Sequence, residues 1–154
     1  VQAFVLEPKG PSGTPRKSFA PEPTPAYGEY ITHNIGNCVM CHTQVDMRTG
    51  KFSGPLFGGG AEHEAVGNPA KKFLTPNLTP DPRWGWLQGW TEDAFVARFR
   101  GGRVHADSPM PWEAFQKMTD NDLRAVYRYF QTLKPAQTGP DPQRHEVVLA
   151  SVNP

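Results

Sequence analysis

The sequence contains few cysteines, no long apolar run and almost no net charge. Only two of its 154 residues are cysteine, and a disulfide between them would close too short a loop to stabilise the fold much. No run approaches the roughly 18 apolar residues of a transmembrane helix, so we expect no transmembrane segment. Lys and Arg number 16 against 15 Asp and Glu. A net charge of +1 does not produce the broad positive field of a nucleic-acid-binding protein, so nucleic acid is not an expected partner.

Proline and glycine, by contrast, are abundant, with 17 and 15 residues respectively. The length is typical of one domain, and this composition predicts a folded domain rich in loops. Residues 1–26 hold six prolines and few apolar residues, which predicts an extended arm. We expect the folded domain over residues 27–135 and a C-terminal tail over residues 136–154. Apolar residues in segments 3–6 and 147–152 predict a short strand pair between the two ends of the chain.

Three segments carry helical signals. Apolar residues at helical spacing predict a short helix over residues 27–37. Thr91 is a candidate N-cap for a helix over residues 92–100, which has acidic residues in its first turn and arginines in its last. Thr119 is the same kind of cap for a longer amphipathic helix that follows it. Residues 50–90 are rich in glycine and proline and predict a flexible loop, so the expected fold is mostly α-helical with long irregular loops.

The two cysteines lie in the pentapeptide Cys38-Val39-Met40-Cys41-His42. Two thiols one helical turn apart can add across the two vinyl groups of a haem, and the adjacent imidazole reaches the iron from the same side. The pattern therefore predicts one covalent haem c, attached through Cys38 and Cys41, with His42 as an iron ligand.

Three other uses of the cysteine pair stay open on the sequence. A thioredoxin-like redox dithiol belongs near alternating strands and helices, a pattern that is missing around Cys38. A zinc site would need two further ligands, and the five histidines include no pair at the spacing typical of zinc ligands. A simple disulfide between Cys38 and Cys41 is the third alternative. Covalent haem is the preferred interpretation.

Methionine or histidine is the usual second protein ligand of a c-type haem iron. Of the four methionines, Met40 and Met47 are tethered close to the attachment site, and Met118 precedes a helix, where it can serve as core. Met110 lies between two prolines, which restrict the backbone of a loop that must hold a weak thioether bond. Met110 is therefore the predicted second ligand, and His105 is its main rival.

Several short motifs follow one another in the chain: Gly28-Glu29-Tyr30, Cys38-Val39-Met40-Cys41-His42, Thr75-Pro76-Asn77-Leu78-Thr79-Pro80-Asp81, Trp90-Thr91-Glu92-Asp93-Ala94-Phe95, Pro109-Met110-Pro111-Trp112 and Met118-Thr119-Asp120-Asn121-Asp122-Leu123. Over residues 27–135 the chain thus resembles the cytochrome c subunits of membrane-bound alcohol and gluconate dehydrogenases. This resemblance implies a class I cytochrome c fold around one haem, with Met110 as the second iron ligand. It also implies a flavin or quinone-cofactor dehydrogenase as electron donor, a cytochrome or oxidase as acceptor, and a periplasmic location after removal of a signal peptide.

Other residues of the central segment are candidates for contacts with the haem or with a partner. Asn77 and Arg83 can meet the haem propionates through hydrogen bonds and charge. Lys71 and Lys72 are a weak candidate docking patch, better explained as solvated charges. Four tryptophans can wall the apolar faces of a haem or serve as ordinary core and surface residues: Trp84, Trp86, Trp90 and Trp112.

Together these observations predict a monohaem cytochrome c that carries single electrons and is not itself an enzyme. One alternative is a haem enzyme with an exchangeable ligand site, such as a peroxidase or an oxidase of small sulfur compounds. Another is an electron-transfer domain of a larger redox enzyme, with the proline-rich arm as the remnant of a linker. Whether Met110 occupies the iron distinguishes the carrier from the enzyme.

Overall fold

The computed structural model describes residues 18–140. Helices make up 34% of these residues and strands 12%, and the strands form two small antiparallel sheets. The prediction of a mostly α-helical cytochrome c fold is therefore wrong, because the described part of the chain is mixed. The strand pair predicted between residues 3–6 and 147–152 lies outside the described residues. The elements are, in order, α1 (Pro25–Tyr30), η1 (Ile31–Ile35), α2 (Cys38–His42), β1 (Val45–Asp46), β2 (Lys51–Phe52), β3 (Glu62–Ala65), β4 (Asn68–Leu74), α3 (Glu92–Arg100), α4 (Trp112–Phe115) and α5 (Asp120–Thr132).

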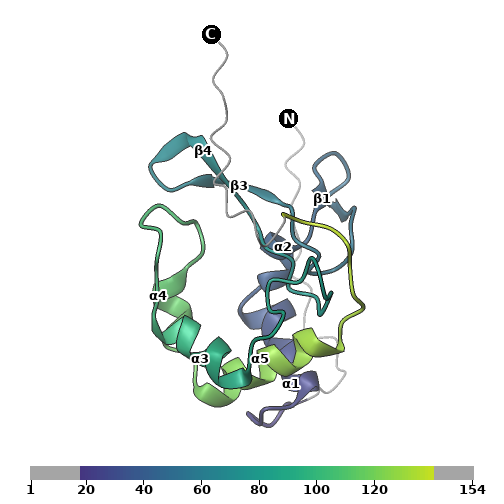
Figure 1. Cartoon of the computed structure of the whole chain (residues 1–154), viewed down its shortest axis with the longest axis vertical. Coiled ribbons are helices and arrows are strands. Elements are labelled where there is room, and N and C mark those ends of the chain that lie inside the picture. Colours follow the sequence, from purple (N-terminus) through teal and green to yellow (C-terminus); the bar gives the residue numbers. More distant parts are fainter. Residues whose placement is uncertain (1–17, 141–154) are drawn as a thin grey trace, which may run out of the picture.

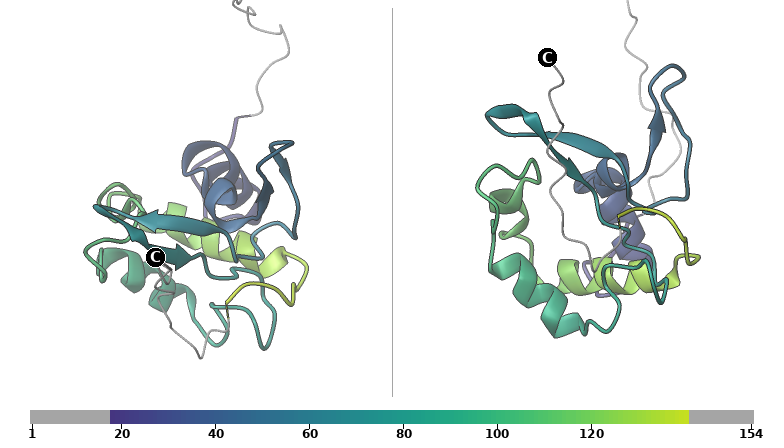
Figure 2. Two further views of the ribbon diagram at one scale, coloured as in Figure 1. Left: turned by 90° about the horizontal axis from the view of Figure 1, so that it is seen from above. Right: turned by 45° about the horizontal axis from the view of Figure 1, so that its top comes forward.

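The elements surround the middle of the molecule (Figures 1 and 2). Helix α5 runs along one end, where α1 and α3 pack against it. Helices α3 and α4 follow one side of the molecule, and the β3–β4 hairpin lies at the end opposite α5. Helix α2 and the loop that precedes α4 are thus on different sides of the fold, and the hairpin extends from one toward the other.

The first helix continues into a π-helical turn, so that α1 and η1 form one rod. The Thr24 side chain accepts a hydrogen bond from the N–H of Tyr27. Pro25 occupies the first turn, where its missing N–H leaves no hydrogen bond unmade. The helix predicted over residues 27–37 is confirmed, although it begins at Pro25 and its last turn ends at Ile35.

The two helices with clear N-caps are also confirmed. The Thr91 hydroxyl caps α3 by accepting from the N–H of Ala94 at 3.1 Å. Thr119 and Asp122 form a capping box at the start of α5, in which each side chain accepts from the backbone N–H of the other. The short helix α4 was not predicted, since it has four residues and begins directly after Pro111.

The prediction of one irregular loop over residues 50–90 is wrong where the two hairpins form. Strand β2 pairs with β1, and β3 pairs with β4, with Glu62 opposite Leu74. The β3–β4 turn contains Gly67 at a φ of 76°, a conformation that glycine adopts without strain. Strand β4 contains Pro69 and two lysines rather than alternating apolar residues, so its composition did not predict a strand.

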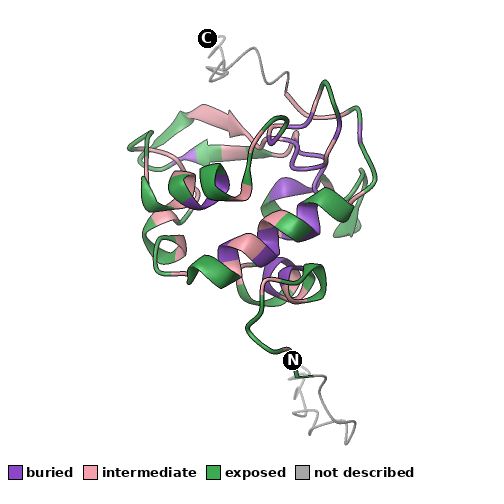
Figure 3. Ribbon diagram, turned by 60° about the horizontal axis from the view of Figure 1, so that its bottom comes forward, coloured by how far each residue is buried: buried purple, intermediate pink, exposed green. Residues whose placement is uncertain are grey.

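The hydrophobic core lies where α5 meets α1, η1 and α3. Figure 3 shows buried residues, in purple, on the inward sides of these helices and exposed residues on their outer sides. Phe57 is fully buried, and its ring lies 5.2 Å from that of Phe130 and 5.8 Å from that of Tyr129. The buried core residues are Ile31, Val39, Phe57, Leu78, Leu87, Phe95, Val96, Leu123, Ala125, Val126, Tyr129 and Phe130.

Gly28 marks a close approach of α1 to α5. A Cβ atom at this position would lie 2.0 Å from the carbonyl oxygen of Ala125 and 2.8 Å from Cβ of Tyr129. Gly28→Ala should therefore force the helices apart and lower the free energy of unfolding by about 1–3 kcal/mol, which denaturant titration measures. Gly101→Ala is the matched control, because a Cβ there would meet backbone atoms only at 3.5 Å. Equal losses in the two variants would contradict the packing argument.

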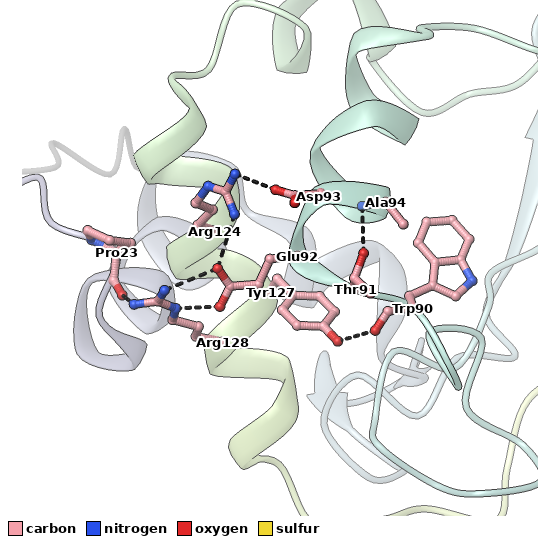
Figure 4. Close-up of polar contacts among 9 residues, drawn as sticks. All are labelled: Pro23, Trp90, Thr91, Glu92, Asp93, Ala94, Arg124, Tyr127 and Arg128. Carbon is pink, nitrogen blue, oxygen red and sulfur yellow. Dashed lines mark hydrogen bonds and ion pairs between the residues drawn. The ribbon is translucent and has the colours of Figure 1, made fainter.

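A cluster of ion pairs joins α5 to the first turn of α3 (Figure 4). Arg128 contacts both carboxylate oxygens of Glu92, and Arg124 pairs with Glu92 and Asp93. Arg128 also donates to the carbonyl oxygen of Pro23 at 2.6 Å. The cluster thus connects three segments of the chain. Its hydrogen bonds, chiefly those from Arg128, hold the pKa of Glu92 below its usual value.

Glu92→Gln should lower the free energy of unfolding by about 1 kcal/mol near pH 7. Because the folded-state pKa of Glu92 is depressed, its contribution is present above the unfolded-state pKa and is lost as the pH falls through the folded-state pKa. The stability difference from the wild type should therefore vanish in acid, which denaturant titration across pH measures. Glu64→Gln, at an exposed glutamate, is the control. A deficit of Glu92→Gln that does not change with pH would contradict this assignment.

Candidate haem-attachment site

The short helix α2 carries both cysteines and His42. Asn37, directly before it, has a φ of 49°, in the left-handed region that asparagine tolerates better than most residues. The chain thereby turns sharply between η1 and α2. Cys38 is half-buried and Cys41 is exposed, and both are free thiols. Burial raises the pKa of Cys38 to about 11, so this thiol is protonated at neutral pH.

His42 is buried, and its ring is oriented by a backbone group from another part of the chain. Its Nδ1 lies 3.1 Å from the carbonyl oxygen of Pro76, which can only accept, so Nδ1 carries the proton. Burial lowers the pKa of His42 to about 4, so the ring is neutral at pH 7. A neutral imidazole with its Nδ1–H on a backbone carbonyl presents Nε2 as a metal ligand. Nothing in the sequence pointed to Pro76 as this partner, because it lies 34 residues away in the chain.

The segment after Pro76 is fixed by Asn77. The Asn77 amide donates to the carbonyl oxygens of Ala136 and Thr138, at 2.6 and 3.0 Å. Its Oδ1 accepts from the N–H and the hydroxyl of Thr79 at 2.8 and 2.7 Å. These four bonds use both amide hydrogens and both lone pairs of the side chain. A contact between Asn77 and a haem propionate stays a prediction, and it would have to replace one of these four hydrogen bonds.

An apolar groove of about 240 Å³ lies beside Cys38. Gly36 forms part of its wall, and a Cβ atom on Gly36 would lie 3.3 Å from Sγ of Cys38 and 3.7 Å from the ring of Phe115. The groove therefore offers apolar surface next to one of the two candidate attachment cysteines. Its other lining residues are Tyr27, Ile31, Ile35, Ala114, Met118 and Asp122.

Met110 lies in the loop before α4, with a half-buried side chain. Its N–H donates to the hydroxyl of Ser108 at 3.4 Å, and its carbonyl oxygen accepts from the N–H of Trp112 at 2.8 Å. The rival His105 is exposed, and its ring lies 6.1 Å from that of Phe73. The role of Met110 as second iron ligand stays a prediction.

The aromatic segment before α3 is organised by the buried carboxylate of Asp81. Its Oδ1 accepts from the N–H groups of Arg83 and Trp84, at 2.9 and 2.8 Å. The exposed Arg83 guanidinium lies 5.4 Å from the ring centroid of Trp84. Trp86 and Trp90 pack against the core instead. Haem contacts from these tryptophans and from Arg83 stay predictions.

Across residues 18–140, no group of three or more His, Cys, Asp or Glu side chains is placed to hold a metal ion. Within this part of the chain, no further ligands for the zinc alternative lie beside the cysteine pair. The described residues also include no helix of the length and apolarity that a membrane crossing requires.

Comparison with known proteins supports the cytochrome interpretation, although no family model matches the chain. The cytochrome c subunit of a quinone-dependent alcohol dehydrogenase from Gluconobacter oxydans is 30% identical over 108 residues, which cover 67% of this chain and 20% of the relative. The cytochrome subunit of a fructose dehydrogenase from Gluconobacter japonicus is 29% identical over 145 residues, which cover 86% of this chain and 27% of the relative. The cytochrome c subunit of a gluconate 2-dehydrogenase from Pantoea cypripedii is 29% identical over 107 residues, which cover 67% of this chain and 22% of the relative.

These relatives confirm that the chain resembles cytochrome c subunits of dehydrogenases. The chain spans about a fifth to a quarter of their length. The resemblance therefore applies to one part of each relative.

Proposed function

We propose that this chain binds one covalent haem c and passes single electrons from a dehydrogenase to a downstream cytochrome or oxidase. The observation that carries the proposal is the arrangement in α2, where two free cysteines flank one helical turn beside a buried, neutral His42. The donor set fits a c-type haem, because thioether attachment needs two thiols at this spacing and the iron needs an unprotonated imidazole nitrogen. The similarity to dehydrogenase cytochrome subunits supports the same function.

Each residue of the site has a distinct role in this proposal. Cys38 and Cys41 would hold the haem, and His42 would bind the iron through Nε2 while the Pro76 carbonyl keeps its ring in place. Met110 would supply a thioether as the second protein ligand of the iron. When bound, the haem provides an iron atom that alternates between the ferrous and ferric states, and thioether ligation favours the ferrous state.

The partners and the location follow from the same resemblance. We infer that the electron donor is a dehydrogenase with a flavin or quinone cofactor, and that the chain works in the periplasm. The protein itself breaks no substrate bond, so it acts as an electron carrier, either alone or as part of a larger oxidoreductase.

A pyridine haemochrome assay combined with acidified-solvent extraction tests this function. We expect one haem per chain, a c-type spectrum and no haem in the organic phase, because two thioether bonds retain it. Haem that is extracted from the native protein, or stoichiometric zinc in place of haem, would refute the proposal.

A further inference from the structure

Lys71 and Lys72 are neighbours in β4, but their charges have different partners. Lys72 pairs with Glu62 inside the same hairpin at 2.8 Å, and both side chains are well exposed. Lys71 reaches out of the hairpin to Asp107, with 2.6 Å between Nζ and Oδ2. The Lys71 and Asp107 side chains are only 20% and 28% exposed, so water screens this pair less. From the sequence, both lysines were a weak candidate docking patch, better explained as solvated charges.

Asp107 is also held through its backbone. The N–H of Val66, in the β3–β4 turn, donates to the carbonyl oxygen of Asp107 at 2.9 Å. Nearby, the ring of Phe73 contacts His105, and the Lys71 ammonium lies 4.9 Å from the centroid of the Phe73 ring. The hairpin therefore contacts the loop that carries Met110 at several points, three to five residues before the methionine.

The same loop is held from its other side by arginines. Arg103 forms two hydrogen bonds with the Glu113 carboxylate, at 2.7 and 2.8 Å, and donates to the carbonyl oxygen of Ser108. Arg98, from α3, lies 3.8 Å from the ring centroid of Trp112. These contacts fix the loop after Asp107 from the side of α3 and α4, and the Lys71–Asp107 ion pair adds a charged tie to the hairpin.

We propose that Lys71 is a positioning residue for Met110, holding the loop closed through Asp107 so that the thioether stays on the iron. This inference rests on the proposed function, since it requires Met110 to be the second ligand. A thioether is a weak ligand, and any opening of its loop lets water or an added base compete for the iron. Loss of the Lys71 tie should therefore make such openings more frequent without removing a ligand.

The test compares Lys71→Gln with Lys72→Gln in the haem-loaded protein. Each variant removes one positive charge from adjacent positions of the same strand, but only the first breaks the ion pair with the loop. Imidazole binding to the ferric protein should be about tenfold faster in Lys71→Gln and unchanged in Lys72→Gln. Amide hydrogen exchange over residues 103–111 should accelerate in parallel. Asp107→Asn should reproduce the effect, and Lys71→Arg, which keeps the charge, should largely restore the slow rate.

Equal imidazole rates in Lys71→Gln, Lys72→Gln and the wild type would overturn the positioning role. Equal acceleration in both variants would overturn it too, because the hairpin as a whole and not the ion pair would then control the loop. In either case a wild-type charge-transfer band from a thioether-ligated ferric haem would leave the proposed function intact. A wild type without that band would instead refute the Met110 ligand, and the role of Lys71 with it.

Discussion

Met110→Ala is expected to lower the reduction potential of the haem-loaded protein by on the order of 100 mV. The thioether stabilises ferrous iron relative to ferric iron, and water in its place does not. The far-red charge-transfer band of the ferric His/Met haem should vanish, and carbon monoxide should bind to the ferrous form. Potentiometry and absorption spectroscopy of the purified variant measure these changes.

Two controls separate Met110 from its rivals. Met118→Ala should keep the band, because Met118 lines the groove beside Cys38 and packs against the core. His105→Ala should keep it as well, because the His105 side chain is exposed. If Met110→Ala retains the band while one of these variants loses it, the ligand assignment is wrong. If the wild type already binds carbon monoxide readily, a haem enzyme with an exchangeable site becomes the better interpretation.

Local signals made the long helices predictable. The caps at Thr91 and Thr119 use side chains within three residues of the N–H groups that they satisfy, so the sequence contains the whole interaction. The π-helical turn of η1 has no such local signal, and its residues were predicted only as part of an ordinary helix.

The hairpins were missed because their strands are short or lack the alternating apolar pattern by which a strand is predicted. Strand β4 has a proline and polar side chains, and its ion pair outside the hairpin joins Lys71 to Asp107, 36 residues away. No pattern within residues 50–90 records that contact. The missed strands are also the reason why the mostly α-helical prediction failed.

The candidate site likewise combines residues that a local sequence pattern predicted with contacts between distant residues that only the structure shows. Cys38, Cys41 and His42 are adjacent in the chain, so their spacing alone indicated the chemistry. The partner that orients His42 is 34 residues away, at Pro76. The sequence offered Asn77 as a partner for a haem propionate, but its hydrogen bond to the carbonyl of Ala136 spans 59 residues and could not be predicted. The sequence therefore predicted the attachment residues, and the structure shows the backbone contact that orients His42.

The largest expected effect on haem content comes from the double variant Cys38→Ala, Cys41→Ala. Without both thiols, only the proposed coordination by His42 and Met110 and apolar contacts would retain the haem, and acid would protonate the imidazole and release it. Acidified organic solvent should then extract essentially all haem from the double variant and none from the wild type. The haemochrome of any haem retained by the variant should shift to that of an unattached haem, because both vinyl groups are intact.

Met40→Ala is the matched control for this loss, because Met40 lies between the two cysteines on the same helical turn. Its side chain is 46% exposed, so its removal should leave the attachment and the extraction result unchanged. Each single cysteine variant should retain haem through one thioether bond, with an intermediate haemochrome spectrum. If the double variant holds its haem as firmly as Met40→Ala does, the two thiols do not attach it, and the cysteine pair must serve one of the other uses that its spacing allows.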